Sequence, residues 1–321
     1  MKQLLKALLF GCAALAASGV WAQAYPSKPV RIVVTFGGGG AAEVYSRIIG
    51  QHLTEMWGQT VLADPRPGAN GIIATEIVAR APADGYTLLA GVDGTHTINP
   101  SFYRKLPYDA VRDFVPITQM FLAPLVVSVH PSVPVKNMKE LVAFAKRSGP
   151  VAFGSAGHGN AGHLAGEAFA QIAGIKLTHV PYKGGAPAMT ALVSGEIPLL
   201  FGNAANAVPL IKSGKFRAIA ITTKQRAESV PDLPTVAESG FPGYEAGTWT
   251  GLFAPAKTPP DIVAKIARDS IQVIRRPDVR EHMIRSALIP VGNTPEEFTA
   301  LMKTESARYA KLIQQLGIHA D

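Results

Sequence analysis

The feature that most restricts the possible folds is an alternation of apolar strands, glycine-rich loops and helices that occurs twice along the chain. In the first half, Val30–Phe36 is a β-branched run that ends in Gly37-Gly38-Gly39-Gly40, and Ala41–Trp57 follows with apolar residues at helical spacing. Strands are also expected at Thr60–Ala63 and Tyr86–Val92, with a helix at Ile72–Ala81 between them. This βαβαβ order predicts a parallel sheet covered by helices on both faces.

The alternation restarts after an irregular stretch that contains Pro100, Pro107 and Pro116. The expected strands are Leu125–Val129, Val151–Gly154, Leu177–Val180, Ile197–Phe201 and Arg217–Thr222, and the expected helices are Met138–Arg147, Ala161–Ala173, Ala186–Ser194 and Ala204–Ser213. Two such units predict two α/β lobes, and the cleft between them is the expected ligand site.

The remaining tail has no second sheet of its own, so we expect it to return to the first lobe. It contains one expected strand, Gly247–Ala254, and expected helices at Pro260–Arg275, Pro277–Arg285 and Pro295–Leu316, each with a proline at its start. The chain would then cross between the lobes near Leu125 and near Val230, and the crossings would act as a hinge. Lobe 1 is expected to hold residues 25–124 and 230–321, and lobe 2 residues 125–229.

The first 24 residues predict export. Lys2 and Lys6 precede an apolar run at Ala7–Ala17, and Ala22-Gln23-Ala24 has the small-x-small pattern of a signal-peptide cleavage site, with cleavage after Ala22 or Ala24. The expected location is therefore the periplasm. Cys12, the single cysteine, lies in this leader, so disulfides, thiolate catalysis and cysteine-based zinc sites are not expected in the mature chain.

Composition excludes two other classes of protein. A 321-residue chain with 47% hydrophobic and 17% charged residues is globular rather than disordered. Its formal net charge is +8, but the basic residues form neither a run nor a stripe interleaved with aromatic residues, so nucleic acid is not an expected partner.

The loop Gly37–Gly40 precedes a helix, where glycines let a ligand approach the backbone and the helix N-terminus attracts an anion. The loop is not a P-loop, because no Gly-Lys-Ser/Thr follows. It also fits a dinucleotide fingerprint through Gly37, Gly39 and Ala42, with Asp64 in place of the ribose-binding acid. A purely structural turn is a third interpretation.

Ser155–Asn160 is the corresponding loop of the second half, with Asn160 as a good N-cap. It fails as a nucleophile elbow, because Phe153 stands where that motif needs glycine. A triad of Ser155 with His158, His163 or His179 and an unidentified Asp stays open on paper. His158 and His163 are five residues apart, which is poor spacing for two metal ligands on one helical face, so no metal site is expected. His163 is interpreted first as a helix-end side chain bonded to nearby backbone.

Three more loops follow strands. Because ligands lie beyond the carboxyl ends of parallel strands, we expect these loops at the same rim of the cleft as the two glycine-rich loops. They are Gly91–Thr97 with Gly94 and Thr95, Tyr182-Lys183-Gly184-Gly185, and Gly202-Asn203. Together the loops describe a clamp for a small anion without a convincing nucleophile, so binding is favoured over catalysis and no cofactor is expected. The candidate ligand-binding residues are Phe36, Gly37, Gly38, Gly39, Gly40, Ala41, Gly94, Thr95, Ser155, Ala156, Gly157, Asn160, His163, Tyr182, Lys183, Gly184, Gly202 and Asn203.

A series of short strings in a fixed order resembles the extracytoplasmic solute receptors of tripartite tricarboxylate transporters, often called the Bug family. The strings are Tyr25–Val30, Arg66–Gly71, Asp84–Leu88, Leu106–Asp109, Asp113-Phe114 with Pro116, Ser155–Gly157, His163-Leu164, His179–Gly184, Leu233–Glu238, Pro242–Tyr244 and Trp249-x-Gly251-Leu252-x-Ala254-Pro255. The resemblance implies a two-lobed, Venus-flytrap fold of the type II periplasmic-binding class. It also implies a monomeric receptor that binds a small organic acid and delivers it to a permease with a large and a small subunit.

The first loop departs from the family pattern, which usually reads Phe-Pro-Pro-Gly-Gly with an Asp two residues later. Here it is Phe36–Gly40 followed by Glu43, and Gly202 stands where many relatives carry Asp. These changes favour a di- or tricarboxylate or an aromatic acid over an amino acid. Two alternative functions are an exported α/β enzyme, either a hydrolase or a dinucleotide oxidoreductase, and a receptor that signals through a membrane sensor kinase.

Overall fold

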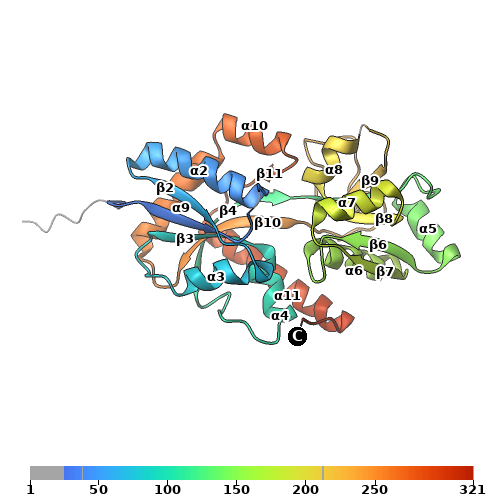
Figure 1. Cartoon of the computed structure of the whole chain (residues 1–321), viewed down its shortest axis with the longest axis horizontal. Coiled ribbons are helices and arrows are strands. Elements are labelled where there is room, and N and C mark those ends of the chain that lie inside the picture. Colours follow the sequence, from blue (N-terminus) through green and yellow to red (C-terminus); the bar gives the residue numbers. More distant parts are fainter. Residues whose placement is uncertain (1–24, 38, 212, 321) are drawn as a thin grey trace, which may run out of the picture.

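The computed structural model describes residues 25–320 apart from Gly38 and Lys212, and it has two α/β lobes arranged along the long axis of the molecule (Figure 1). The expected signal peptide, residues 1–24, lies outside the described residues. Among the helices that the structure describes, none combines the length and hydrophobicity needed to cross a membrane.

Lobe 1 is built on a six-stranded sheet with the strand order β11-β4-β10-β3-β1-β2. Helices α2, α9 and α10 cover one face of this sheet, and α3 and α11 cover the other. The elements of lobe 1 are β1 (Val30–Val34), α2 (Ala41–Trp57), β2 (Val61–Pro65), η1 (Ala69–Gly71), α3 (Ile72–Ala79), β3 (Thr87–Val92), η2 (Gly94–Ile98), α4 (Asn99–Phe102), β4 (Phe114–Ala123), β10 (Thr248–Pro255), α9 (Pro260–Ile274), α10 (Pro277–Arg285), β11 (Ile289–Pro290) and α11 (Pro295–Leu316).

Lobe 2 is built on a five-stranded sheet with the strand order β7-β6-β8-β5-β9. Helices α5 and α6 pack on one face, and α7 and α8 pack on the other. The elements of lobe 2 are β5 (Leu125–Val129), α5 (Met138–Ser148), β6 (Val151–Ser155), α6 (Ala161–Ala173), β7 (Leu177–Pro181), α7 (Gly185–Ser194), β8 (Leu199–Asn203), α8 (Ala204–Ile211) and β9 (Arg217–Ile221).

Both sheets are mixed, so the prediction of parallel sheets is wrong for the strands that bring the chain into a lobe. β1 pairs in parallel with β2 and β3, and β6 with β7 and β8. β5 and β10 are antiparallel to their neighbours. The reason is geometric: the parallel strands run toward the other lobe, whereas β5 and β10 begin at the crossing and run away from it.

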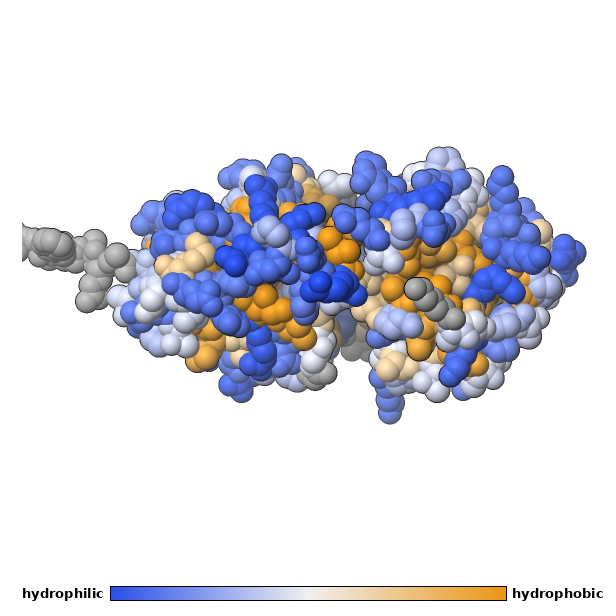
Figure 2. Space-filling view, turned by 90° about the horizontal axis from the view of Figure 1, so that it is seen from above, coloured by the Kyte–Doolittle hydropathy of each residue, from blue (hydrophilic) through white to orange (hydrophobic). Residues whose placement is uncertain are grey.

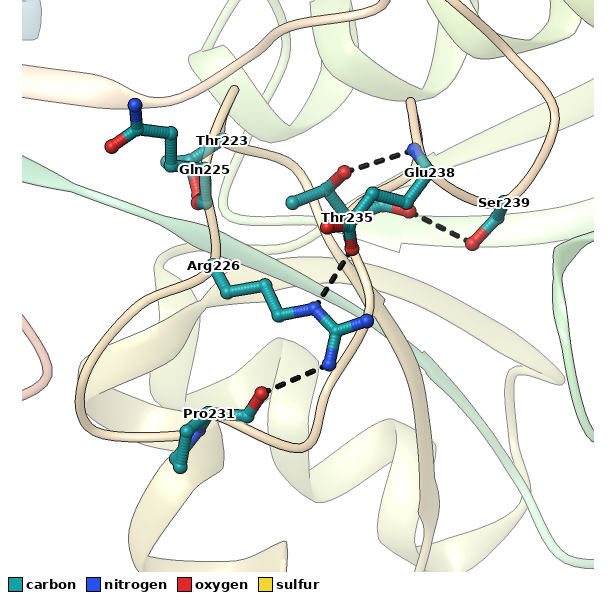
Figure 3. Close-up of polar contacts among 7 residues, drawn as sticks. All are labelled: Thr223, Gln225, Arg226, Pro231, Thr235, Glu238 and Ser239. Atoms are coloured by element: carbon teal, nitrogen blue, oxygen red, sulfur yellow. Dashed lines mark hydrogen bonds and ion pairs between the residues drawn. The ribbon is translucent and has the colours of Figure 1, made fainter.

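The chain enters lobe 2 at Pro124, next to the expected crossing at Leu125, and returns at Gly247 rather than near Val230. The segment 222–246 stays with lobe 2, because Val236 and Tyr244 are buried in its core and the Val236 N–H donates to the Ile221 carbonyl. Side chains tie this segment together (Figure 3): the Arg226 guanidinium donates to the Glu238 carboxylate at 2.9 Å and to the Pro231 carbonyl at 3.1 Å.

Strand β4 is the one long element that the sequence analysis left unassigned. It has ten residues, lies between β10 and β11, and leads directly into β5 across Pro124. Pro116 lowers the strand signal because proline cannot donate to a sheet. In the structure Pro116 pairs with Phe253 at a register shift, which is where a strand tolerates proline.

Helix α11 holds the two lobes together from one side. A small apolar cluster combines Tyr309 and Leu312 of α11 with Phe102 of α4 and with Leu164 of α6 in lobe 2. Gly159 approaches Phe102 so closely that an added Cβ would lie 2.5 Å from the ring. The loop between β6 and α6 is therefore in contact with lobe 1.

The close packing of α6 on β6 generates a prediction. Gly166 faces the fully buried Phe153 ring, and a Cβ at this position would overlap it. Gly166→Ala should lower the free energy of unfolding by about 1–3 kcal/mol in a urea titration, although alanine favours helix. Ile172→Ala, at an exposed position of the same helix, should change it by less than about 0.5 kcal/mol. Equal effects would contradict this packing.

Candidate ligand-binding cleft

A cavity of about 400 Å³ lies where the two lobes meet, and residues of both lobes line it. The space-filling view shows the lobes separated by a notch with hydrophobic residues on its sides (Figure 2). Lobe 1 contributes the loop after β1, the residues after β3 and the start of β10. Lobe 2 contributes the loop after β6, the start of α7 and the end of β8. The carboxyl ends of parallel strands from both sheets therefore face one cavity.

Nine of the candidate residues line this cavity: Phe36, Gly40, Ala41, Gly94, Ala156, Asn160, Gly184, Gly202 and Asn203. Eight others do not: Gly37, Gly39, Thr95, Ser155, Gly157, His163, Tyr182 and Lys183. Gly38 lies outside the described residues. The expected loops thus reach the cleft, but the sequence does not tell which residue of each loop faces it.

Local hydrogen bonds explain why several polar candidates turn away from the cavity. The Thr95 hydroxyl is buried and donates to the Val92 carbonyl at 2.8 Å. The Tyr182 hydroxyl donates to Glu196 at 2.7 Å. The Ser155 hydroxyl is buried between the Gly157 carbonyl, at 2.9 Å, and His179 Nε2, at 2.7 Å. These groups hold the loops in shape.

Sequence reasoning missed six lining residues whose side chains carry a hydrogen-bonding group: Asn70, Asp93, Asn206, Thr248, Trp249 and Thr250. Asp93 lies inside the Gly91–Thr97 loop that was expected at the cleft, so its position was within reach of the pattern. Thr248, Trp249 and Thr250 reach the cavity because the return crossing is at Gly247. Trp249 begins one of the strings that carry the family resemblance, but that string does not indicate that its side chain faces the cleft.

Helix N-termini converge on the cavity from both lobes. Gly40, Ala41 and Ala42 line it at the start of α2, Asn160 and Ala161 at the start of α6, and Gly184 and Gly185 at the start of α7. The Asn160 side chain caps α6 by accepting the His163 N–H at 2.9 Å. The first N–H groups of a helix have no partner within the helix, and the helix dipole favours negative charge there. The cavity is therefore built to bind an anion.

Three histidines beside the cleft form a stack. The rings of His163 and His179 lie 3.8 Å apart and nearly parallel, and His158 lies 4.9 Å from His163. Their nitrogens come within 4.8 Å of one another, the distance of a possible metal site. A metal must lie in the plane of each ring that binds it, however, and His163 Nδ1 already accepts the Gly159 N–H at 3.1 Å. The stack is a packed structural unit.

The Ser155–His179 pair has the distance of a nucleophile and its base, but not the access. Ser155 has no exposed surface, so its hydroxyl cannot reach a molecule in the cavity. Burial is also the main cause that lowers the pKa of His163 to about 3 and that of His179 to about 4, with the neighbouring histidines adding to it. Both rings are neutral at pH 7.

The charge of the cleft comes from one residue. Among the described residues that line the cavity, Asp93 is the one ionisable side chain. It is buried, its Oδ1 accepts a hydrogen bond from the Thr248 hydroxyl, and its Oδ2 has no hydrogen-bond partner among the described residues. Burial is the main cause that raises the pKa of this carboxyl to about 7.

A second cavity of similar volume lies between α6 and α11. Its wall includes Tyr309 and Leu312, which already hold the lobes together, and Arg308, which donates to the Glu245 carbonyl at 2.7 Å. It lies away from the strand ends and their loops. We therefore take the cavity between the strand ends as the candidate site.

Comparison with known proteins assigns the family. The model of the tripartite tricarboxylate transporter family receptor matches residues 45–318. The chain belongs to this family. The expected resemblance is thus confirmed, and so is the two-lobed fold of a periplasmic solute receptor. The members of the family are binding proteins and not enzymes, so the hydrolase and oxidoreductase alternatives are not supported.

Three similar proteins cover nearly the whole chain. The UPF0065 protein in the tcbD-tcbE intergenic region of Pseudomonas sp. (strain P51) is 36% identical over 93% of this chain and 89% of its own. The structure of R. palustris Rpa4515 with adipate is 34% identical to this chain, with a TM-score of 0.82. The match covers 92% of this chain and 99% of that one. The structure of MatC (Rpa3494) from Rhodopseudomonas palustris with bound malate is 30% identical to this chain, with a TM-score of 0.76. The match covers 90% of this chain and 100% of that one.

The histidine stack predicts a pH dependence of stability. Because the folded state lowers the pKa of His163 and His179, the unfolded chain takes up protons first as the pH falls below about 6.5. The melting temperature should therefore fall between pH 6.5 and pH 4. His179→Gln should flatten this fall, whereas His319→Gln, at an exposed position, should leave it unchanged. If the melting temperatures of the two variants depended on pH in the same way, the fall could not be attributed to the histidine stack.

Proposed function

We propose that this protein is exported to the periplasm, where it binds a small organic acid between its lobes and presents it to a membrane permease with a large and a small subunit. The observation that carries this proposal is the convergence of helix N-termini from both lobes on one cavity. The predicted signal peptide supports export. Binding that draws the lobes together would give the permease a closed, loaded form to recognise.

The lining of the cavity favours a dicarboxylate with an apolar middle. Phe36, Phe121, Leu200 and Trp249 supply apolar surface, while backbone N–H groups and asparagine side chains supply donors around it. A volume of about 400 Å³ is at the small end of the range for ligand sites. Relatives solved with adipate and malate support the same class of ligand.

The proposal is tested by calorimetry on the mature protein with adipate, malate, citrate, benzoate and glutamate. We expect binding of adipate or malate with one ligand per chain, since a single cleft is formed by the two lobes of one monomer. If glutamate alone of the five acids gave a heat of binding, the proposed dicarboxylate class of ligand would be wrong. If none of the acids binds after denaturation and refolding has removed any ligand carried over, the receptor proposal fails.

A charge placed in the cleft gives a sharper test. Ala41 is the first residue of α2 and lines the cavity. Ala41→Asp should leave the fold stable, because an acidic side chain is favoured at a helix N-terminus, but it should weaken dicarboxylate binding about tenfold or more by charge repulsion. Ala41→Asn, of matched size and neutral, should weaken it much less. Equal affinities for the two variants would place the anion elsewhere.

A further inference from the structure

The cleft combines anion-binding backbone with a buried acid and no balancing cation. The described lining residues include no lysine, arginine or histidine, and Asp93 is the one ionisable group among them. A carboxylate ligand would therefore enter a cavity whose wall already holds a second, buried carboxyl group. Two like charges at close range repel each other more strongly when one of them is shielded from water. One of them must be neutralised for binding to be tight.

The surroundings of Asp93 do not supply that neutralisation. The Thr248 hydroxyl of β10 donates to Oδ1. The backbone N–H groups of Trp249 in β10 and of Gly94 in η2 also act to lower the pKa of the carboxyl, but none of these groups carries a charge. On α11, the nearby ionisable groups are Glu305, which repels a negative charge on Asp93, and the buried phenol of Tyr309.

The nearby cationic side chain is already engaged, and the nearby imidazole is neutral. Arg308 contacts Glu305 at 3.3 Å and the Glu245 carbonyl at 2.7 Å. His96, in η2, is buried and stacked on Phe253, and burial lowers the pKa of its ring to about 3.

We propose that the cleft binds its carboxylate ligand together with one proton, and that Asp93 holds this proton in the loaded receptor. The proposal rests on the proposed function and extends it by naming the proton as a second ligand. A protonated Asp93 removes the repulsion and turns one of its oxygens from an acceptor into a donor. The loaded cleft then carries the charge of the ligand alone.

The direction of the pH dependence follows from linkage. Burial raises the pKa of the Asp93 carboxyl to about 7 in the free protein, so the group is largely protonated at pH 6.5 and largely ionised at pH 8.5. A ligand that selects the protonated form loses affinity in proportion to the fraction that remains protonated. The dissociation constant should therefore rise about tenfold or more between these pH values, while the ligand itself stays ionised.

The experiment is calorimetry of adipate binding, or of malate binding if only malate binds, at pH 6.5, 7.5 and 8.5. Each titration is repeated in two buffers with different heats of ionisation, which reports proton uptake on the unmodified protein. We expect nearly one proton per ligand at pH 8.5 and less than half a proton at pH 6.5. Binding with no proton uptake and an unchanged dissociation constant would overturn the proposal while leaving the proposed function intact.

Two substitutions identify the group that takes up the proton. Asp93→Asn, which keeps the acceptor for Thr248, should bind with an affinity that changes less than about twofold with pH and without proton uptake. Glu305→Gln removes a largely buried acid that does not line the cavity, so the rise of the dissociation constant with pH should persist. It should begin at a slightly lower pH, because Glu305 no longer repels the ionised Asp93. Weaker binding by Asp93→Asn at every pH would show instead that an ionised Asp93 accepts a donor of the ligand.

A third variant moves the pKa of Asp93 without removing the acid. Thr248→Val deletes the hydroxyl that donates to Asp93 Oδ1. This hydrogen bond stabilises the ionised carboxylate, so its loss should raise the pKa of Asp93. The affinity loss should then begin at a higher pH than in the unmodified protein. A shift to lower pH would contradict the role of Asp93. Failure of every carboxylate to bind at any pH would instead count against the proposed function itself.

Discussion

The convergence of helix N-termini from two separate sheets on one gap is the constraint on which the rest of this structure depends. Strands β1, β3, β6 and β8 all run toward the cleft, and the helix or turn that follows each of them begins there. A single continuous sheet could not bring two such edges face to face. The chain crosses between the lobes twice, at Pro124 and Gly247, because β10 and the helices after it return to the first sheet. The strands that follow the crossings, β5 and β10, run away from the cleft.

Much of this arrangement could be predicted from sequence, because strand–loop–helix units leave a local signal. Val30–Val34 and Val151–Ser155 are apolar runs that end in small residues, and the helices after them have apolar stripes. The signal fails where long-range pairing overrides local propensity. Pro116 hides β4, whose ten residues are held by β10 and β11, and the segment 222–246 shows no local mark of the lobe on which it packs.

The site was predictable as a set of loops but not as a set of side chains. Gly40, Ala41 and Asn160 were expected at helix starts and line the cavity, whereas Ser155 and Thr95 turn inward to hold their own loops. Asp93 and Thr248 are far apart in sequence and meet because β10 pairs with β3.

The measurement that tests the account most directly is a crystal structure of the mature protein with adipate or malate. The account predicts one ligand between the lobes, with a carboxylate at the N-termini of α2 and α6 and with Asp93 near its other end or side. The lobes would be in contact across the ligand. A ligand in the cavity between α6 and α11, or on one lobe alone with the cleft open, would contradict it.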